Sequence, residues 1–215
     1  MLKQWLIVLG LLAAAGDPRV PYHSVQLLTV PDGVCTAFSI NEQQGYWVTD
    51  DHCLEDGLGT IKRFPTTLVK AWPDLDLAVL AGPPAPGLKI AEEIPVARTP
   101  IFKWGYGQSA RPWMSKGYTT QHFAYIPMAK HIVWLYNLEI APGDSGAPVM
   151  TYDGVVVSVA EIYWPPSLKK KSRLLSSYEH PGGGLDTITL HEALAPYLPG
   201  YVAPKGDSGD RQASE

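Results

Sequence analysis

Cysteine and charged side chains are scarce in this chain, and no long basic segment interrupts it. Two of the 215 residues are cysteine and 18% are charged, with 17 Lys and Arg against 21 Asp and Glu. Proteins that follow nucleic acid by its phosphates gather Lys and Arg along one segment or face. The lack of such a segment and the formal net charge of −4 predict no nucleic-acid partner.

Long apolar runs are also rare, and the longest, Trp5–Ala15, follows Lys3 near the N-terminus. A membrane-spanning helix needs about 20 apolar residues, which is longer than this run. One basic residue, a short apolar run and small residues before Gly16 are typical of a secretory signal peptide. We expect residues 1–15 to be removed by cleavage after Ala15, which leaves a secreted or periplasmic protein without a membrane span. An uncleaved anchor or a buried helix is the alternative.

Uninterrupted helical stretches are few, because the chain has 20 Gly and 20 Pro. With 46% hydrophobic residues it is too apolar to be disordered throughout. Short β-branched runs between turn residues predict an all-β protein, either a sandwich or barrels. The predicted strands are Ser24–Val30, Val34–Ile40, Tyr46–Thr49, Thr60–Phe64, Thr67–Ala71, Leu75–Ala81, Pro100–Trp104, Tyr118–Ile126, Ile132–Leu138, Ala147–Thr151 and Val155–Ile162.

A Gly- and Pro-rich stretch near the middle, Gly82–Gly87, could begin a linker between two β halves. We therefore predict an N-terminal β unit at residues 16–95 and a C-terminal β unit at residues 96–200. The one good helical stretch is late, at His191–Leu198. Residues 201–215 are small and polar, and we expect them to be a disordered tail.

The two cysteines are Cys35 and Cys53, and export changes how they are interpreted. In an oxidising compartment two thiols that meet usually form a disulfide, which is the prediction here. A pair of buried reduced thiols is one alternative, and a metal site that uses His52 beside Cys53 is another. The remaining ligands of a metal site are missing at the usual spacings, so we expect neither metal nor cofactor.

Three short segments carry side chains suited to hydrolysis. One ends a strand in an imidazole, one begins an apolar strand with a carboxylate, and one holds a serine between glycines. They are Tyr46–Cys53 with His52, Asp74–Leu80 with Asp76, and Ala141–Val149 with Ser145. Glycines permit a sharp turn whose backbone N–H groups point to one place, and such a turn suits a nucleophile.

The order His, Asp, Ser, in Thr-x-x-His-Cys, Asp-Leu-Ala-Val-Leu and Gly-Asp-Ser-Gly-Ala-Pro-Val, resembles the trypsin-like (chymotrypsin-fold) serine proteases. The resemblance covers roughly Val25 to Leu198. It implies two six-stranded antiparallel β-barrels packed face to face, with the active site between them and a short C-terminal helix. It also implies polypeptide substrates and supports the Cys35–Cys53 bridge, because relatives often have this pair.

The resemblance implies a catalytic role for one side chain in each of these segments. Ser145 would be the nucleophile, His52 the base that takes its proton, and Asp76 the carboxylate that orients the imidazole. The backbone N–H groups of Gly143 and Ser145 would form the oxyanion hole. Asp74 competes with Asp76 for the carboxylate role, and Ser145 could instead be an ordinary turn serine.

Two interpretations of function follow. The first is an exported serine endopeptidase that works through an acyl-enzyme, and the alternative is a catalytically lapsed protease-like domain that serves as a binding module. In zymogen-activated relatives the carboxylate at Asp144 pairs with a freed N-terminus, yet no Ile-Val-Gly-Gly-like start occurs here. A second Gly-Asp-Ser-Gly, at Gly206–Gly209, lies in the polar tail without an apolar strand after it, so we treat it as a chance match.

Substrate specificity is predicted from two further positions. Glu139, six residues before Ser145, occupies the position that lies near the base of the specificity pocket in the family, where a carboxylate favours Arg or Lys. Tyr163 is expected on the pocket wall, where its bulk would restrict the pocket to small or apolar side chains. Both expectations stay open at this point.

Overall fold

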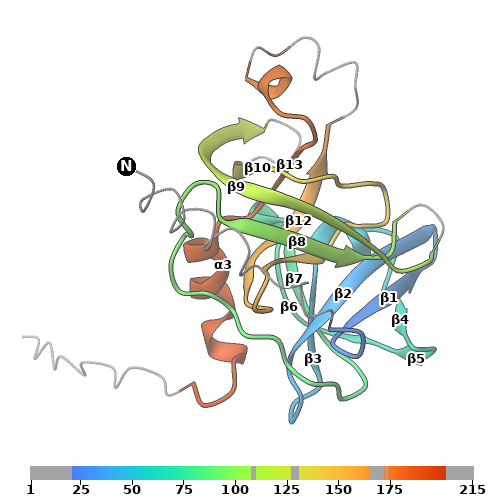
Figure 1. The fold of residues 1–215 in the computed structure, drawn as a ribbon. Helices are drawn as coiled ribbons and strands as arrows, with labels where there is room; N and C mark the ends of the chain where they lie inside the picture. The colour runs from blue at the N-terminus through green and yellow to red at the C-terminus, as the bar shows by residue number, and fades with distance from the viewer. Residues whose placement is uncertain (1–20, 108–109, 127–130, 165–171, 173, 202–215) are drawn as a thin grey trace, which may run out of the picture.

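The structure is a computed structural model, and it describes residues 21–107, 110–126, 131–164, 172 and 174–201 (Figure 1). The predicted signal peptide and nearly all of the predicted tail lie outside the described residues. None of the described helices is long and apolar enough to cross a membrane.

The N-terminal half forms a seven-stranded antiparallel sheet in the order β5-β4-β1-β2-β3-β7-β6. Short turns connect most of its strands, so neighbours in sequence are mostly neighbours in the sheet. Its strands are β1 (Val25–Val30), β2 (Gly33–Asn41), β3 (Tyr46–Thr49), β4 (Thr60–Ile61), β5 (Phe64–Pro65), β6 (Thr67–Trp72) and β7 (Leu77–Ala81).

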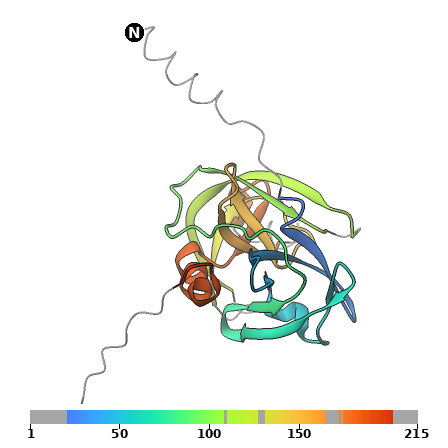
Figure 2. The same cartoon turned by 90° about the horizontal axis from the view of Figure 1, so that it is seen from below.

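The C-terminal half forms a closed antiparallel barrel in the order β10-β13-β12-β11-β8-β9. It is followed by α3 (Thr187–Leu194), the one α-helix of the described residues, which lies beside the two β units (Figures 1 and 2). The barrel strands are β8 (Pro100–Gly105), β9 (Trp113–Ile126), β10 (His131–Asn137), β11 (Ala147–Thr151), β12 (Val156–Tyr163) and β13 (Pro181–Gly184).

The predicted fold class, all-β in two units with a short C-terminal helix, is confirmed. The strands of the N-terminal unit form an open sheet with β5 and β6 at its edges, whereas those of the C-terminal unit form a closed barrel. The helix begins four residues earlier than predicted, because the side chain of Asp186 accepts hydrogen bonds from the N–H groups of Ile188 and Thr189. Such an N-cap offsets the low helix propensity of the β-branched residues that follow it.

Strand β13 was not predicted, because three of its four residues are glycine and glycine is depleted in strands. The strand forms here because its neighbours leave no room for side chains. A Cβ on Gly184 would lie 1.7 Å from the carbonyl oxygen of Val159, and one on Gly183 would lie 2.6 Å from Val133. Glycine thus lets β13 pack closely enough to close the barrel.

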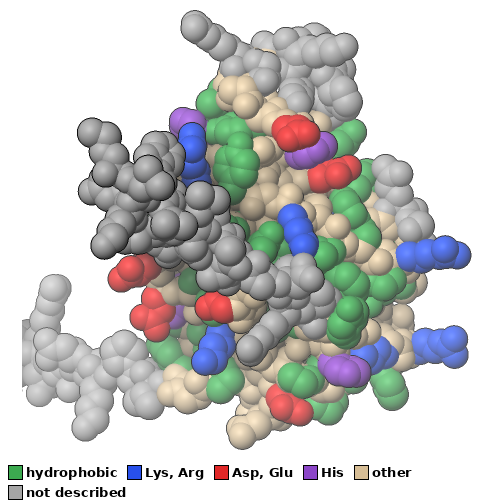
Figure 3. All heavy atoms as spheres, viewed as in Figure 1, with side chains coloured by type: hydrophobic (Ala, Val, Ile, Leu, Met, Phe, Trp, Pro, Cys, Tyr) green, Lys and Arg blue, Asp and Glu red, His purple; other side chains and the backbone are tan. Residues whose placement is uncertain are grey.

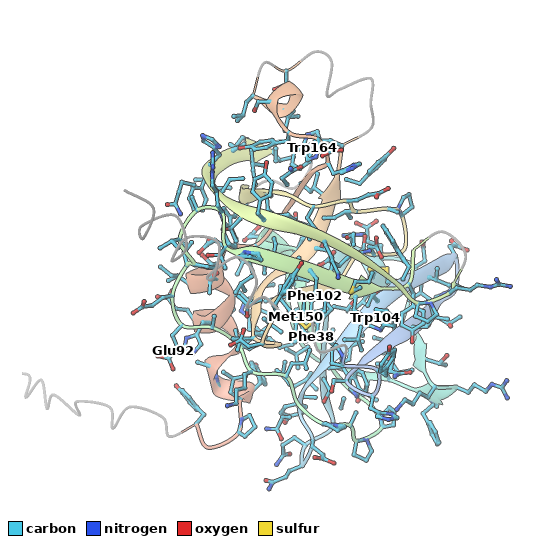
Figure 4. All side chains as sticks on the ribbon, in the orientation of Figure 1. Phe38, Glu92, Phe102, Trp104, Met150 and Trp164 are labelled. Atoms are coloured by element: carbon cyan, nitrogen blue, oxygen red, sulfur yellow. A yellow bond between two sulfur atoms is a disulfide. The ribbon has the colours of Figure 1, made fainter. Side chains whose placement is uncertain are left out.

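The two β units share one apolar core (Figure 4). Phe38 from β2 packs in the same buried cluster as Phe102 from β8 and Met150 from β11. Burying a side chain of this size stabilises the fold by roughly 1.5–3 kcal/mol. The shared core therefore fixes the two units against each other.

Cys35 on β2 and Cys53, in the turn after β3, form the predicted disulfide, with their Cα atoms 6.3 Å apart. Both cysteines are buried, and neither thiol is free. The alternatives of reduced thiols and of a metal site with Cys53 were wrong. The bridge attaches the turn after β3 to the neighbouring strand β2.

Candidate active site

His52 and Asp76 lie together because their strands are neighbours. Thr49 at the end of β3 pairs with Ala78 at the start of β7. His52 follows β3 in a 3-10 turn, η1 (Asp51–Leu54), and Asp76 precedes β7. Because the two strands run antiparallel, the end of β3 and the start of β7 lie side by side, which brings both side chains to the same end of this strand pair.

A chain of hydrogen bonds joins Asp76, His52 and Ser145. The Oδ2 atom of Asp76 lies 2.6 Å from Nδ1 of His52, and Nε2 of His52 lies 3.0 Å from Oγ of Ser145. The backbone N–H of His52 also donates to Oδ1 of Asp76 at 2.8 Å, so both carboxylate oxygens are engaged. The side chain of Asp74 is exposed and has no hydrogen bond to another described residue. The structure therefore places Asp76, and not Asp74, against the imidazole.

The pKa values of the two partners move apart. Partial burial lowers the pKa of His52, but the hydrogen bond and charge of Asp76, with the charges of Glu161 and Glu55, raise it more. Burial raises the pKa of Asp76, but the hydrogen bonds and charge of His52 lower it more. Each group thus stabilises the charged form of the other.

Ser145 sits in a tight turn whose glycines have no room for a side chain. Gly143 and Gly146 have φ values of 93° and 80°, in the region that favours glycine. A Cβ on Gly143 would lie 2.5 Å from the carbonyl oxygen of Tyr106. The N–H groups of Gly143 and Ser145 donate to no other described residue. Both donors are therefore available at this turn for a bound group.

Thr36, on β2 beside Cys35, lies in the N-terminal β unit and donates two hydrogen bonds to this turn. Its N–H donates to the carbonyl oxygen of Ser145 at 2.8 Å, and its hydroxyl donates to that of Gly143 at 2.9 Å. No sequence motif marks Thr36 as part of the site, apart from its position next to Cys35.

Asp144 is buried and has a cation as its partner. The Nζ atom of Lys103 on β8 lies 2.5 Å from Oδ2 of Asp144, and the indole N–H of Trp113 donates to Oδ1 at 2.9 Å. The N–H of Ala141 also donates to Oδ2, so Asp144 closes the turn before Ser145. Burial lowers the pKa of Lys103 to about 8, against the raising effect of Asp144. Sequence analysis missed Lys103, which lies in an otherwise apolar strand.

A second histidine–carboxylate pair lies near the site. Nε2 of His131 on β10 lies 3.1 Å from Oε2 of Glu161 on β12, and both side chains are nearly buried. Burial raises the pKa of Glu161, although His131 opposes this. Neither residue was predicted.

The two residues predicted to set specificity are exposed. Glu139 lies in the segment before the Ser145 turn, where its backbone carbonyl accepts from the hydroxyl of Ser115. Tyr163 ends β12 and is 45% exposed. On the face seen in Figure 3, the Lys and Arg side chains among the coloured atoms are scattered and not gathered into one patch.

Three side chains of the kind that bind metal ions lie close together in this region. Ligand atoms of Asp50, His52 and Asp76 lie within 4.8 Å of one another. The imidazole and carboxylate of His52 and Asp76 already bond to each other, so these donors are not free for an ion. We therefore propose no metal here.

Comparison with known proteins gives a family and a fold. The model of the trypsin-like peptidase domain family matches residues 35–159. A sequence search of curated proteins finds no match.

Among solved structures, the inactive form of the Rv3671c protease of M. tuberculosis has a TM-score of 0.67 and 20% identity, covering 84% of this chain and 97% of its own. The serine endoprotease of Yersinia pestis has a TM-score of 0.62 and 14% identity, covering 81% of this chain and 62% of its own. The HtrA-type protease AlgW with a decapeptide has a TM-score of 0.63 and 14% identity, covering 85% of this chain and 66% of its own. At these identities the similarity is one of fold.

Proposed function

The chain belongs to the trypsin-like peptidase domain family, and on that premise we propose that it is a serine endopeptidase with Ser145, His52 and Asp76 as its catalytic residues. The observation that carries the proposal is the hydrogen-bond chain from Asp76 through His52 to Ser145. The family match supports a polypeptide as the substrate.

Catalysis would run through an acyl-enzyme. Oγ of Ser145 attacks the scissile carbonyl carbon while Nε2 of His52 takes the hydroxyl proton, and Asp76 stabilises the imidazolium. The N–H groups of Gly143 and Ser145 bind the oxyanion. The C–N bond then breaks as His52 returns the proton to the leaving amine. Water then attacks the ester carbon while His52 takes one of its protons, and His52 returns this proton to Oγ of Ser145 as the C–O bond breaks and the acid leaves.

The alternative of a lapsed binding module differs in one testable respect. A fluorophosphonate reacts with a serine that a neighbouring base activates, and an ordinary serine does not react. We expect the wild-type protein to be labelled at Ser145 and to hydrolyse a mixed peptide library. Ser145→Ala and His52→Ala should each remove both activities, and the double variant should lose no more, because the two groups act as one unit.

A matched pair of variants separates the two candidate carboxylates. Asp76→Asn should lower turnover by about 10⁴-fold, whereas Asp74→Asn, two residues away and exposed, should leave it unchanged. An unlabelled but folded wild-type protein would contradict the proposed function, and labelling at another serine would contradict the assignment of Ser145.

We also propose that the protein is exported, with residues 1–15 as its signal peptide. The Cys35–Cys53 disulfide supports this, because such bridges persist in oxidising compartments. N-terminal sequencing of the protein recovered from its producing cells should begin at Gly16. A mature protein that retained Met1 would contradict cleavage after Ala15.

A further inference from the structure

One buried carboxyl group beside the site has no part in the proposed reaction. Asp50 lies between β3 and η1, two residues before His52, and is 1% exposed. No lysine or arginine forms an ion pair with it among the described residues. Its Oδ2 atom accepts a hydrogen bond from the backbone N–H of Gly146 at 2.8 Å. The two residues are 96 positions apart and belong to different β units.

Gly146 directly follows Ser145, so this bond acts on the peptide group that joins them. The carbonyl oxygen of that peptide accepts from the N–H of Thr36 at 2.8 Å, and its N–H donates to Asp50. The N-terminal sheet thus holds both polar ends of one peptide plane. The same N–H also donates to the carbonyl oxygen of Ala160 at 3.0 Å. Ala160 lies on β12, so the barrel also helps to hold this peptide.

We propose, on the basis of the proposed function, that Asp50 is a positioning residue which sets the place of Ser145 relative to His52 by holding the Ser145–Gly146 peptide. The carboxyl lies on the chain segment that carries His52, so one short stretch of backbone places both the imidazole and, through the peptide, the serine. A misplacement of about 1 Å at a reacting atom can cost about 100-fold in rate, so the proposal predicts that loss of this bond slows catalysis.

The charge state of Asp50 decides which variant tests this role. The ionisable groups that face it are Asp76, Glu161, His52 and Tyr136. Burial, followed by the charges of Asp76 and Glu161, raises the pKa of Asp50 well above its usual value, against the hydrogen bond from Gly146. This shift favours the neutral carboxyl, whose carbonyl oxygen can still accept the hydrogen bond from Gly146. Asparagine has the same shape and the same acceptor.

The experiment compares Asp50→Asn and Asp50→Ala with Asp56→Asn, an exposed control in the turn after η1. The readouts are kcat and KM on a peptide from the library, the fluorophosphonate labelling rate, and the pH profile of kcat/KM. We expect Asp50→Ala to lower kcat and labelling by about 10- to 100-fold with little change in KM. Asp50→Asn should stay near the wild type with the same pH midpoint, as should Asp56→Asn.

Each contrary result overturns the proposal. Wild-type labelling in Asp50→Ala would show that the bond does not position Ser145. A lowered pH midpoint in Asp50→Asn would show a charged group with an electrostatic role. Equal losses in Asp50→Asn and Asp50→Ala would show that the hydrogen-bond acceptor, which the amide keeps, is not what positions Ser145.

Amide hydrogen exchange at Gly146 gives a reading that does not need activity. In Asp50→Ala this N–H keeps Ala160 as its remaining acceptor and loses the shorter bond, so exchange should quicken there and stay near the wild-type rate in Asp50→Asn. An unchanged rate in Asp50→Ala overturns the proposal even if the wild type proves inactive, and inactivity alone contradicts only the proposed function. If Asp50→Ala fails to fold, the labelling rate, the pH midpoint and the Gly146 exchange rate of Asp50→Asn still test the positioning role of Asp50.

Discussion

The ammonium group of Lys103 lies 2.5 Å from the carboxylate of Asp144, and neither side chain is exposed to solvent. A buried ion pair is costly to break, because the remaining charge has no partner. Lys103→Met should therefore lower the free energy of unfolding at pH 7 by about 3–5 kcal/mol. The double variant with Asp144→Asn should lose less, because no buried charge remains. Urea denaturation measures both, and equal losses would show that an unpaired carboxylate at Asp144 costs no more than an asparagine there.

The pH dependence of hydrolysis follows from the raised pKa of His52. Only the neutral imidazole accepts the proton of Ser145, so kcat/KM should rise with pH through a midpoint above about 6.5, the usual histidine value. Asp76→Asn removes the hydrogen-bonded charge that raises this pKa, so the midpoint should fall. NMR of the His52 ring proton measures it even in the slow variant. An unchanged midpoint would contradict the role of Asp76, and Asp74→Asn is the control.

The disulfide should contribute measurably to stability. Cys35 and Cys53 are 18 positions apart, and in the loop-entropy model closing a loop of this length stabilises the fold by about 3 kcal/mol. We expect a similar loss in the Cys35→Ala, Cys53→Ala double variant and in reduced wild type, measured by urea denaturation. A loss below about 1 kcal/mol would contradict the loop-entropy model, in which the bridge stabilises the fold by lowering the entropy of the unfolded chain.

The glycine strand β13 should be intolerant of side chains. In Gly184→Ala the new Cβ would lie 1.7 Å from the carbonyl oxygen of Val159, which the barrel cannot accommodate without moving a strand. Loss of the folded state, or a fall of at least about 3 kcal/mol, is expected. Gly33→Ala is the matched control, because nothing lies within 4 Å of its Cβ position. Circular dichroism and thermal melts distinguish the two.

The cleavage specificity can be decided by two variants. Since Glu139 is exposed, water screens its charge, and we expect Glu139→Gln to keep the cleavage sites of the wild type. If Tyr163 forms the pocket wall, wild type should cut after small or apolar residues and Tyr163→Ala should admit larger ones. Peptide-library profiling measures both. Loss of cleavage after Arg and Lys in Glu139→Gln would place Glu139 in the pocket.

The parts of the site that the sequence predicted are those with local motifs. His52, Asp76 and Ser145 each lie in a short pattern of turn and strand residues, and the structure brings the three into hydrogen-bond contact. Lys103 stands in an apolar strand, and Asp50 is an unspecified position of the Thr-x-x-His-Cys pattern, so no local motif marks either residue. Their roles depend on strand neighbours that only the folded sheet defines.

For the fold, too, the sequence predicted the features that depend on local residues. Short β-branched runs between turn residues predicted most of the strands, because such runs reflect local burial. They could not locate β13, where the close approach of Val159 and Val133, and not strand propensity, selects glycine. They also could not show that the first ladder stays open while the second closes, because closure depends on pairing between distant strands.

The shared core of Phe38, Phe102 and Met150 joins the unit that carries His52 to the unit that carries Ser145. A chain in which this core has not formed lacks the contact that holds His52 beside Ser145. On the proposed function, peptidase activity would therefore arise in the same folding step that packs the two units together.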